Sequence, residues 1–293
     1  MKKLLVFTMI FVFCINLLMA STNIKMISTN MASRTNTLDT NLPNQPDINI
    51  HFSVIGNTRI NYDIYKQLVD SIMKTNPDFV INTGGVVNVY NNDNEWLKFK
   101  KASKPIFDSV PYYCVPSFKE VFSTTYYKLF KLKNNKAYFS ITNQNSLFLF
   151  LNSNNVKAGD EQITWLTDLL EKSDKFTFKF IILNFPIYSS GQLGGDIKLQ
   201  ILLQDLIKKY GIDMIIAGND SDYERLKVQK TTYIISGGGG APTTPMGTKD
   251  ENNIVFKSTF HYCDITIHNR TLFCKTIDKT GAVIDEFQIH ELR

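Results

Sequence analysis

The fold is decided by IIAGNDSDYER at residues 215–225 and YIISGGGGAP at residues 233–242. Each stretch begins with a short apolar run that is typical of a buried strand, and each run ends in a loop of small and polar residues. Loops at strand ends are where α/β sheets place their functional sites. The two stretches therefore predict an α/β sheet with a candidate site at the ends of its strands.

The rest of the chain from residue 48 onward alternates strand-like and helix-like segments. Ile64, Leu68 and Ile72 form a helical apolar stripe, and Gly211 is expected to end a later helix. Segments of βαβ type with β-only additions predict one α/β domain over residues 48–293, with two sheets and helices outside them. The expected strand-like segments are 48–54, 78–82, 111–115, 137–141, 146–152, 176–183, 212–218, 233–240 and three β-rich stretches between 254 and 290. The expected helices include 96–106 and 161–170, the latter capped by Asp160.

Six strand ends carry motif-like clusters in a fixed order. In this order and spacing the chain resembles the calcineurin-like metallophosphoesterases, the broad family that includes purple acid phosphatases, and the resemblance covers residues 48–290. The clusters are GNTR (56–59), NTGGVVN (82–88), VPSFKE (115–120), NFPIYSSG (184–191), GNDSDYER (218–225) and SGGGGAP (236–242).

The resemblance implies a two-layer β-sandwich flanked by helices, with two metal ions at the strand ends. In that family, Asp, His and Asn side chains hold the metals, and a metal-bound hydroxide attacks a phosphorus ester. Such chemistry needs charged or imidazole ligands for two dications and a proton donor for the leaving oxygen.

This chain departs from the family pattern at nearly every functional position. Lys119 stands at the catalytic position of the third motif, where the family has His, and none of the four His residues of the chain occupies a ligand position. The positions equivalent to metal ligands are Asn57, Arg59, Gly85, Phe118, Asn184, Asn219 and Ser221.

Neutral amides cannot compensate the charge of a dication, so these residues are not expected to hold a catalytic metal pair. The sequence predicts a pseudoenzyme with a binding or scaffolding role and no cofactor. The alternative is a weakly active phosphoric ester hydrolase that retains one or two divalent metal ions.

Several other residues of the loops have competing interpretations. Asp220, Asp222 and Glu120 either recruit one hard ion or are solvated loop acids, and the second interpretation is favoured because no ligand spacing connects them. The Gly237–Gly240 run lacks the Gly-Lys-Ser/Thr of a phosphate-binding loop, so a backbone turn is expected. Residues 223–225, Tyr-Glu-Arg, are expected to tie the fifth loop down.

Arg59 and Lys119 are expected to stand on two loops that converge at the former metal centre. They either pair with local acids such as Glu120 or form a pocket for an anionic or phosphate-containing ligand. Free amides of the Gly84-Gly85 turn and of the Gly237–Gly240 run are expected to assist the second arrangement.

The N-terminus predicts export. Residues 1–20 have the order of a secretory signal peptide, with two lysines, an apolar run and small residues at 20 and 21, and residues 21–47 read as a flexible polar spacer. Retention of the segment as an anchor is less favoured, and lipidation at Cys14 least. The mature protein is expected in the periplasm, at the cell surface or outside the cell, without a stable membrane anchor.

Charge and cysteine content limit the partners. The formal net charge is +5, and removal of Lys2 and Lys3 would leave +3, which gives little reason to expect nucleic-acid binding. The mature chain keeps three cysteines, so at most one pair can form, and the pattern leaves open whether Cys263 and Cys274 face each other.

Overall fold

The computed structural model describes residues 48–133, 136–154 and 156–291. The predicted signal peptide (1–20) and polar spacer (21–47) lie outside these residues, so both stay predictions. Residues 47–293 form one compact unit. Among the described residues, no helix is both long enough and apolar enough to cross a bilayer.

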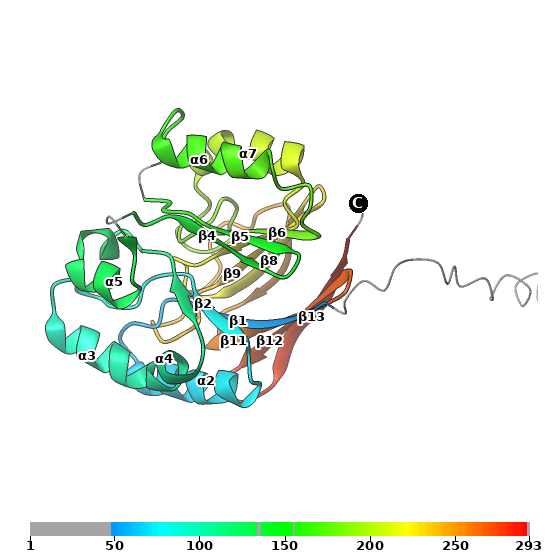
Figure 1. Cartoon of the computed structure of the whole chain (residues 1–293). Coiled ribbons are helices and arrows are strands. Elements are labelled where there is room, and N and C mark those ends of the chain that lie inside the picture. Colours follow the sequence, from blue (N-terminus) through cyan, green and yellow to red (C-terminus); the bar gives the residue numbers. More distant parts are fainter. Residues whose placement is uncertain (1–47, 134–135, 155, 292–293) are drawn as a thin grey trace, which may run out of the picture. The chain divides into compact units, whose positions relative to one another are not determined.

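Two sheets form the centre of this unit (Figure 1). The first sheet contains β1 (Asn49–Ile55), β2 (Phe79–Asn82), β3 (Tyr112–Cys114), β11 (His261–His268), β12 (Thr271–Asp278) and β13 (Val283–His290). The second contains β4 (Phe139–Asn143), β5 (Ser146–Phe150), β6 (Phe178–Ile182), β7 (Met214–Ala217), β8 (Tyr223–Val228), β9 (Thr231–Ser236) and β10 (Asn253–Lys257).

The strand orders place the six motif-bearing loops together. The first sheet runs β13-β12-β11-β1-β2-β3 and the second runs β10-β8-β9-β7-β6-β5-β4. Strands β1, β2 and β3 are parallel neighbours, as are β6, β7 and β9. Because parallel strands end at the same edge of a sheet, the loops after these six strands gather at one edge of each sheet.

The two sheets pack face to face over aromatic side chains. Phe148 of β5 and Phe180 of β6 are stacked with ring centroids 4.6 Å apart, and Phe52 of β1 meets Phe148 edge to face at 5.3 Å. All three side chains are buried in one cluster that draws on both sheets. This is the inner layer of a β-sandwich, and it confirms the predicted two-layer architecture.

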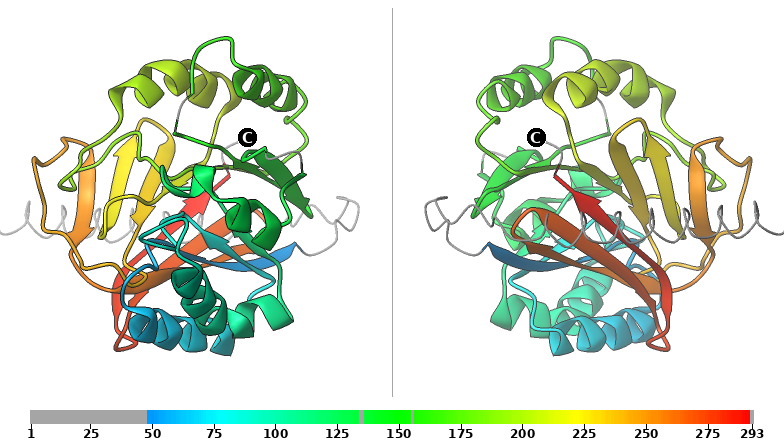
Figure 2. Two further views of the ribbon diagram at one scale, coloured as in Figure 1. Left: turned by 90° about the vertical axis from the view of Figure 1, so that its left-hand side faces the viewer. Right: turned by 90° about the vertical axis from the view of Figure 1, so that its right-hand side faces the viewer.

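Helices cover both outer faces, as Figures 1 and 2 show. Apolar residues of α2 to α5 pack on the first sheet, and those of α6 and α7 pack on the second. The unit 47–293 thus contains its own inner core and two outer ones. The helices are α2 (Tyr62–Lys74), α3 (Asp93–Ala102), α4 (Lys104–Ser109), the short 3₁₀ turn η1 (Glu120–Phe122), α5 (Thr124–Leu129), α6 (Glu161–Leu170) and α7 (Ile197–Tyr210).

Local details of the prediction need correction. The expected helix 96–106 is two helices, because the chain turns at Ser103 before Pro105 enters the first turn of α4. The three β-rich stretches near the C-terminus are four strands, and β8 begins inside the fifth motif at Tyr223. Asp160 does stand at the N-cap of α6, but its carboxylate accepts from the Lys157 amide rather than from the helix.

One local prediction is confirmed at Gly211, and the question that the sequence left open about the cysteines is answered. Gly211 ends α7 in the left-handed conformation at φ 61°, which a residue with a Cβ adopts at a cost. Cys263 and Cys274 both lie in the inner core and both are free thiols, as is Cys114.

Candidate functional site

The motif-bearing loops are joined through their backbones. The Asn57 amide donates to the Gly84 carbonyl at 2.8 Å, and the Ala241 amide donates to the Asn57 carbonyl at 2.7 Å. In the second sheet the Gly218 amide donates to the Asn184 carbonyl at 3.0 Å. These bonds join the first, second and sixth motifs to one another, and they join the fourth motif to the fifth.

A side-chain amide occupies the middle of this cluster. The Asn57 Nδ2 group donates to the Asn219 carbonyl at 2.8 Å and contacts the Ser221 hydroxyl at 3.1 Å, while Asn57 Oδ1 accepts from Arg59 Nη1 at 2.9 Å. Asn57 is buried. Asn57 thus bonds to three other positions equivalent to metal ligands, Arg59, Asn219 and Ser221. Its side-chain nitrogen and its side-chain oxygen both have protein partners.

Gly85 faces the same two side chains. A Cβ at this position would lie 2.4 Å from Asn57 Oδ1 and 2.6 Å from Arg59 Nη1, and the Gly85 φ angle is +72°. The space next to the Gly85 backbone, where the resemblance predicts a metal-ligand side chain, is therefore filled by the Arg59 guanidinium and the Asn57 amide. Burial lowers the pKa of Arg59, an effect that the charge of Glu120 opposes, and a guanidinium stays charged in proteins.

Asn184 lies behind the second motif. Its Nδ2 group donates to the Thr83 carbonyl at 2.7 Å, and a Cβ at Gly84 would lie 2.8 Å from it. Asn184 Oδ1 is buried and has no hydrogen-bond partner among the described residues. Thr83 was not singled out in the sequence, yet it contacts two other motifs. Its carbonyl accepts from Asn184, and its Oγ1 donates to the Ser236 carbonyl at 3.0 Å.

Glu120 organises the turn after β2 and is not a solvated acid. The buried carboxylate accepts from the amides of Gly85 (3.2 Å), Val86 (2.5 Å) and Val87 (3.2 Å), and from Ser117 at 2.9 Å. Burial raises the pKa of Glu120, although these four donors act against the rise. Of the amides expected to be free for an external anion, that of Gly85 thus already faces an internal one, and that of Gly84 donates to Asn82 Oδ1 at 2.8 Å.

Phe118 and Lys119 do not join the Asn57 cluster in any described contact. Lys119 is exposed, and its Nζ donates to the Asn88 carbonyl at 2.9 Å. Phe118 is 59% exposed and packs against Phe122. Of the two cations predicted to converge, Arg59 is at the centre and Lys119 lies on the outside of its loop.

Asp220 and Asp222 of the fifth motif are also buried, so the favoured interpretation of solvated loop acids is wrong for them too. Asp220 accepts from the Ser189 hydroxyl at 2.9 Å, and Glu224 accepts from the Ser190 amide at 2.8 Å. Burial, followed by the charges of Asp220 and Glu224, raises the pKa of Asp222 to about 8.

Within the residues that the structure describes, no group of three or more His, Cys, Asp or Glu residues is arranged to hold a metal ion.

Arg225 and Glu224 have the structural role that was predicted for the fifth loop. Arg225 makes a two-pronged contact with Asp285 of β13, through Nε at 2.7 Å and Nη2 at 3.0 Å. Tyr223 donates to the same carboxylate at 2.6 Å. These contacts tie β8 of the second sheet to β13 of the first.

The glycine run serves close packing. The Gly237 amide donates to the Asp222 carbonyl at 3.1 Å, and the Gly239 amide donates to the Gly56 carbonyl at 2.8 Å. A Cβ at Gly237 would lie only 1.8 Å from the Asp220 carbonyl oxygen. The run thus acts through its backbone, as predicted, although its residues form a bend and not a hydrogen-bonded turn.

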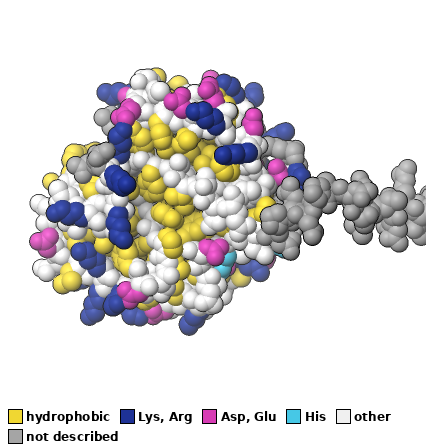
Figure 3. Space-filling view, in the orientation of Figure 1, with side chains coloured by type: hydrophobic (Ala, Val, Ile, Leu, Met, Phe, Trp, Pro, Cys, Tyr) yellow, Lys and Arg dark blue, Asp and Glu magenta, His cyan; other side chains and the backbone are white. Residues whose placement is uncertain are grey.

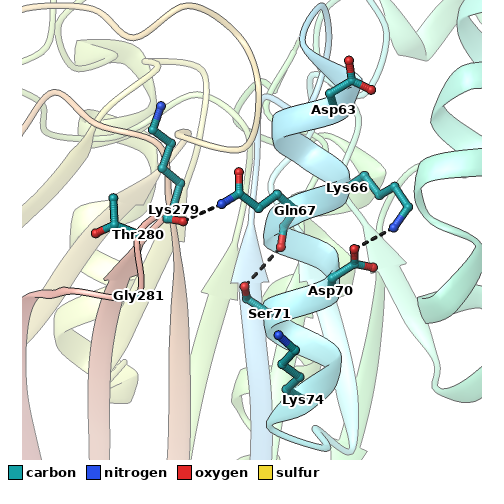
Figure 4. Close-up of a pocket in the computed structure, with 9 residues that line it drawn as sticks. All are labelled: Asp63, Lys66, Gln67, Asp70, Ser71, Lys74, Lys279, Thr280 and Gly281. Atoms are coloured by element: carbon teal, nitrogen blue, oxygen red, sulfur yellow. Dashed lines mark hydrogen bonds and ion pairs between the residues drawn. The ribbon is translucent and has the colours of Figure 1, made fainter.

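The groove drawn in Figure 4 lies elsewhere, between α2 and the turn that joins β12 to β13. It has a volume of about 670 Å³ and contains a Lys66–Asp70 ion pair of 2.6 Å and a hydrogen bond from Gln67 Nε2 to the Lys279 carbonyl. Its lining residues include none of the positions equivalent to metal ligands.

We expect Gly85→Ala to destabilise the unit by about 2–4 kcal/mol, because the new Cβ meets two side chains at a positive φ. Urea unfolding of residues 47–293 measures the change. Arg59→Ala added to Gly85→Ala should recover part of the loss, since it removes the 2.6 Å contact. Lys119→Ala, which removes a cation outside the cluster, should recover none, and equal recovery by both would contradict this geometry.

No family model matches the chain. Glideosome-associated protein 50 of Plasmodium falciparum (isolate 3D7) is 29% identical over 108 residues, which are 36% of this chain and 27% of that protein. The match thus spans about a quarter of the length of the relative.

Solved structures are similar over most of the chain. Purple acid phosphatase PPD1 from yellow lupin (Lupinus luteus) seeds has a TM-score of 0.71 at 18% identity, covering 85% of this chain and 55% of that one. GAP50, the anchor in the inner membrane complex of Plasmodium, has a TM-score of 0.67 at 17% identity, covering 84% and 90%. PhoD has a TM-score of 0.63 at 11% identity, covering 85% and 70%. At these identities the likenesses show the fold.

Proposed function

We propose that this chain, which has the calcineurin-like metallophosphoesterase fold, is an exported binding or scaffolding protein that performs no phosphoester hydrolysis. The observation that carries the proposal is the filling of the space beside Gly85. Arg59 Nη1 and Asn57 Oδ1 lie where a side chain at position 85 would begin. Since fold alone does not imply activity, the proposal rests on this site.

The chemistry of the cluster supports the proposal in a second way. A two-metal mechanism needs anionic ligands that hold two dications about 4 Å apart. Here the central cation is a guanidinium fixed by Asn57. A guanidinium has no acceptor atom and cannot bind a metal, and its charge repels a dication.

A role in binding a protein partner draws on the comparison with GAP50. That protein is described as the anchor in the inner membrane complex of Plasmodium, and its fold covers 84% of this chain. We carry over the role of anchoring or scaffolding, and not a particular partner. Export remains a proposal from the sequence of residues 1–20.

Anion binding by Arg59 and Lys119 stays a prediction. The structure gives Arg59 a partner in Asn57 and Lys119 a partner in the Asn88 carbonyl. Phosphate titration of the unit and of the Arg59→Ala, Lys119→Ala double variant measures whether any such ligand binds.

We expect the purified protein to contain no stoichiometric metal and to hydrolyse neither phosphomonoesters nor phosphodiesters when Mn²⁺ is added. Elemental analysis and the two assays, run beside a purple acid phosphatase as positive control, measure this. The melting temperature should also be unchanged by a chelator, because a metal that binds only the folded state would stabilise it. Two tightly held metals per chain, or metal-dependent turnover, would overturn the proposal.

A further inference from the structure

Three aromatic rings lie exposed on two segments, the loop after β2 and the segment after β3 that includes η1. The Phe122 ring contacts the Phe118 ring at 6.0 Å and the Tyr90 ring at 6.1 Å between centroids. Phe118 is 59% exposed, Phe122 is 62% exposed and Tyr90 is 37% exposed. We call these three residues the aromatic tip. Exposed aromatic side chains that gather in this way mark interaction sites.

The loops that carry the aromatic tip are held in place by hydrogen bonds. Lys119 Nζ donates to the Asn88 carbonyl at 2.9 Å, which joins the two loops. Tyr127 Oη of α5 donates to the Val121 carbonyl at 3.1 Å, and buried Glu120 accepts four backbone amides beneath the tip. These hydrogen bonds thus fix the positions of the loops that carry the three rings.

The part of the chain that carries the tip is strongly basic. Residues 86–136 contain nine lysines and four acidic residues, a formal charge of +5, which equals the formal net charge of the whole chain. One of those acids, Glu120, is buried, whereas every one of the lysines is exposed. The lysines are Lys98, Lys100, Lys101, Lys104, Lys119, Lys128, Lys131, Lys133 and Lys136.

Four of these lysines, Lys98, Lys100, Lys101 and Lys128, lie on α3 and α5, which pack near the tip. The Trp96 Nε1 group of α3 donates to the Tyr90 carbonyl at 2.8 Å, and Phe99 of α3 contacts Phe130 next to α5 with ring centroids 6.4 Å apart. Figure 3 shows Lys and Arg side chains along the side of the unit that α3 and α5 form, at the left of the view. Leu97 of α3, 64% exposed, adds apolar surface there.

The composition of this face favours a lipid surface over a protein. Residues 86–136 contain no Arg, and Arg rather than Lys is enriched where proteins recognise one another. Lysines on flexible stems suit a diffuse layer of anionic headgroups, while projecting rings suit the boundary between headgroups and acyl chains. The groove of Figure 4 lies on α2 and not at the tip.

We propose that the aromatic tip and the lysines of α3 and α5 bind the surface of an anionic membrane, with Phe118 and Phe122 entering the interface. The lysines attract the unit to the headgroups, and the rings then bury apolar area in the bilayer. This contact goes beyond the scaffolding role proposed above and does not depend on whether the former metal centre is inactive.

Vesicle co-sedimentation of residues 47–293 tests the proposal. This compact unit contains all three hydrophobic clusters and lacks the apolar run of residues 4–19, which would enter bilayers by itself. We expect binding to phosphatidylcholine vesicles that contain 30% phosphatidylserine, weaker binding when salt is raised, and no binding to phosphatidylcholine alone.

Two sets of substitutions separate the two contributions. Lys98→Ala with Lys100→Ala and Lys101→Ala should lower vesicle affinity at least tenfold, since one lysine near an anionic surface contributes about fivefold. Phe118→Ser with Phe122→Ser should separately lower it at least tenfold, because these changes remove the apolar area that enters the interface. Both sets of substitutions change exposed side chains, and circular dichroism verifies that the two variant proteins fold.

The matched control is the exposed face of α7. Ile197→Ser with Ile201→Ser removes apolar side chains that are 60% and 66% exposed, and Lys208→Ala with Lys209→Ala removes two lysines from the same helix. These changes should leave vesicle binding unchanged. The proposal is overturned by equal binding to neutral vesicles, by an equal effect of the control changes, or by binding of an acidic polypeptide such as polyglutamate in the absence of any vesicle binding.

Discussion

Gly237→Ala should strongly destabilise the folded state of residues 47–293. The new Cβ would lie 1.8 Å from the Asp220 carbonyl oxygen, a backbone atom on the neighbouring loop. A side-chain end can rotate away from such a contact, but the Asp220 backbone is held because its amide donates to the Gly218 carbonyl at 2.9 Å. We expect a loss of at least about 4 kcal/mol, which is a large part of the stability of an ordinary domain.

The measurement is soluble yield together with a thermal melt followed by circular dichroism. Gly159→Ala is the matched control, because that glycine has φ +80° but open space around its missing Cβ. It should cost only about 1 kcal/mol. A Gly237→Ala protein that melts at the temperature of the Gly159→Ala protein would show that the loops after β7 and β9 are not packed as described.

Asp222→Asn should stabilise the folded unit at pH 8 by as much as about 5 kcal/mol. Asp222 is fully buried, its Oδ1 has no partner among the described residues, and its Oδ2 has one long contact of 3.4 Å from Thr244 Oγ1. Burial and the charges of Asp220 and Glu224 raise the pKa of Asp222 to about 8. An amide has nearly the same shape and carries no charge to bury.

The direction of the pH dependence follows from proton linkage. The pKa of an unfolded Asp is about 3.9, so between that value and about 8 the unfolded chain releases a proton that folded Asp222 keeps. The folded state therefore binds more protons, and the wild-type protein loses stability as pH rises through this window. Below pH 4 the carboxyl is neutral in both states, and the advantage of the Asn variant disappears.

Urea unfolding of both proteins between pH 4 and pH 8 measures the difference. The difference between the two curves isolates Asp222 from the other buried acids, which both proteins share. Asp205→Asn on the exposed face of α7 is the control and should leave the curve unchanged. A stability difference that does not grow with pH would contradict a protonated Asp222.

Much of the fold could be predicted because the signals are local. The apolar stripe of α2 and the apolar runs of β5 and β6 each show their element within about ten residues. The elements that were missed have weaker local signals: α5 and η1 are short, and β8 begins directly after two buried acids. Short elements are stabilised chiefly by contacts with distant residues.

The sequence by itself determined which chemical groups are missing from the site. The resemblance of the six motifs predicts that Asn57, Gly85 and Asn219 stand at metal-ligand positions, and side-chain type alone excludes them as a set of anionic ligands. Residue type is independent of geometry, so this conclusion needed no coordinates.

Only the tertiary structure decided what the remaining charged groups do. Glu120 and Asp222 looked like solvated loop acids, yet both are buried. Arg59 and Lys119 looked like partners, yet one lies against Asn57 and the other against the Asn88 carbonyl on the exterior. The physical reason is that burial and side-chain direction are set by contacts between residues far apart in the chain, and loops carry no periodic pattern from which those contacts could be inferred.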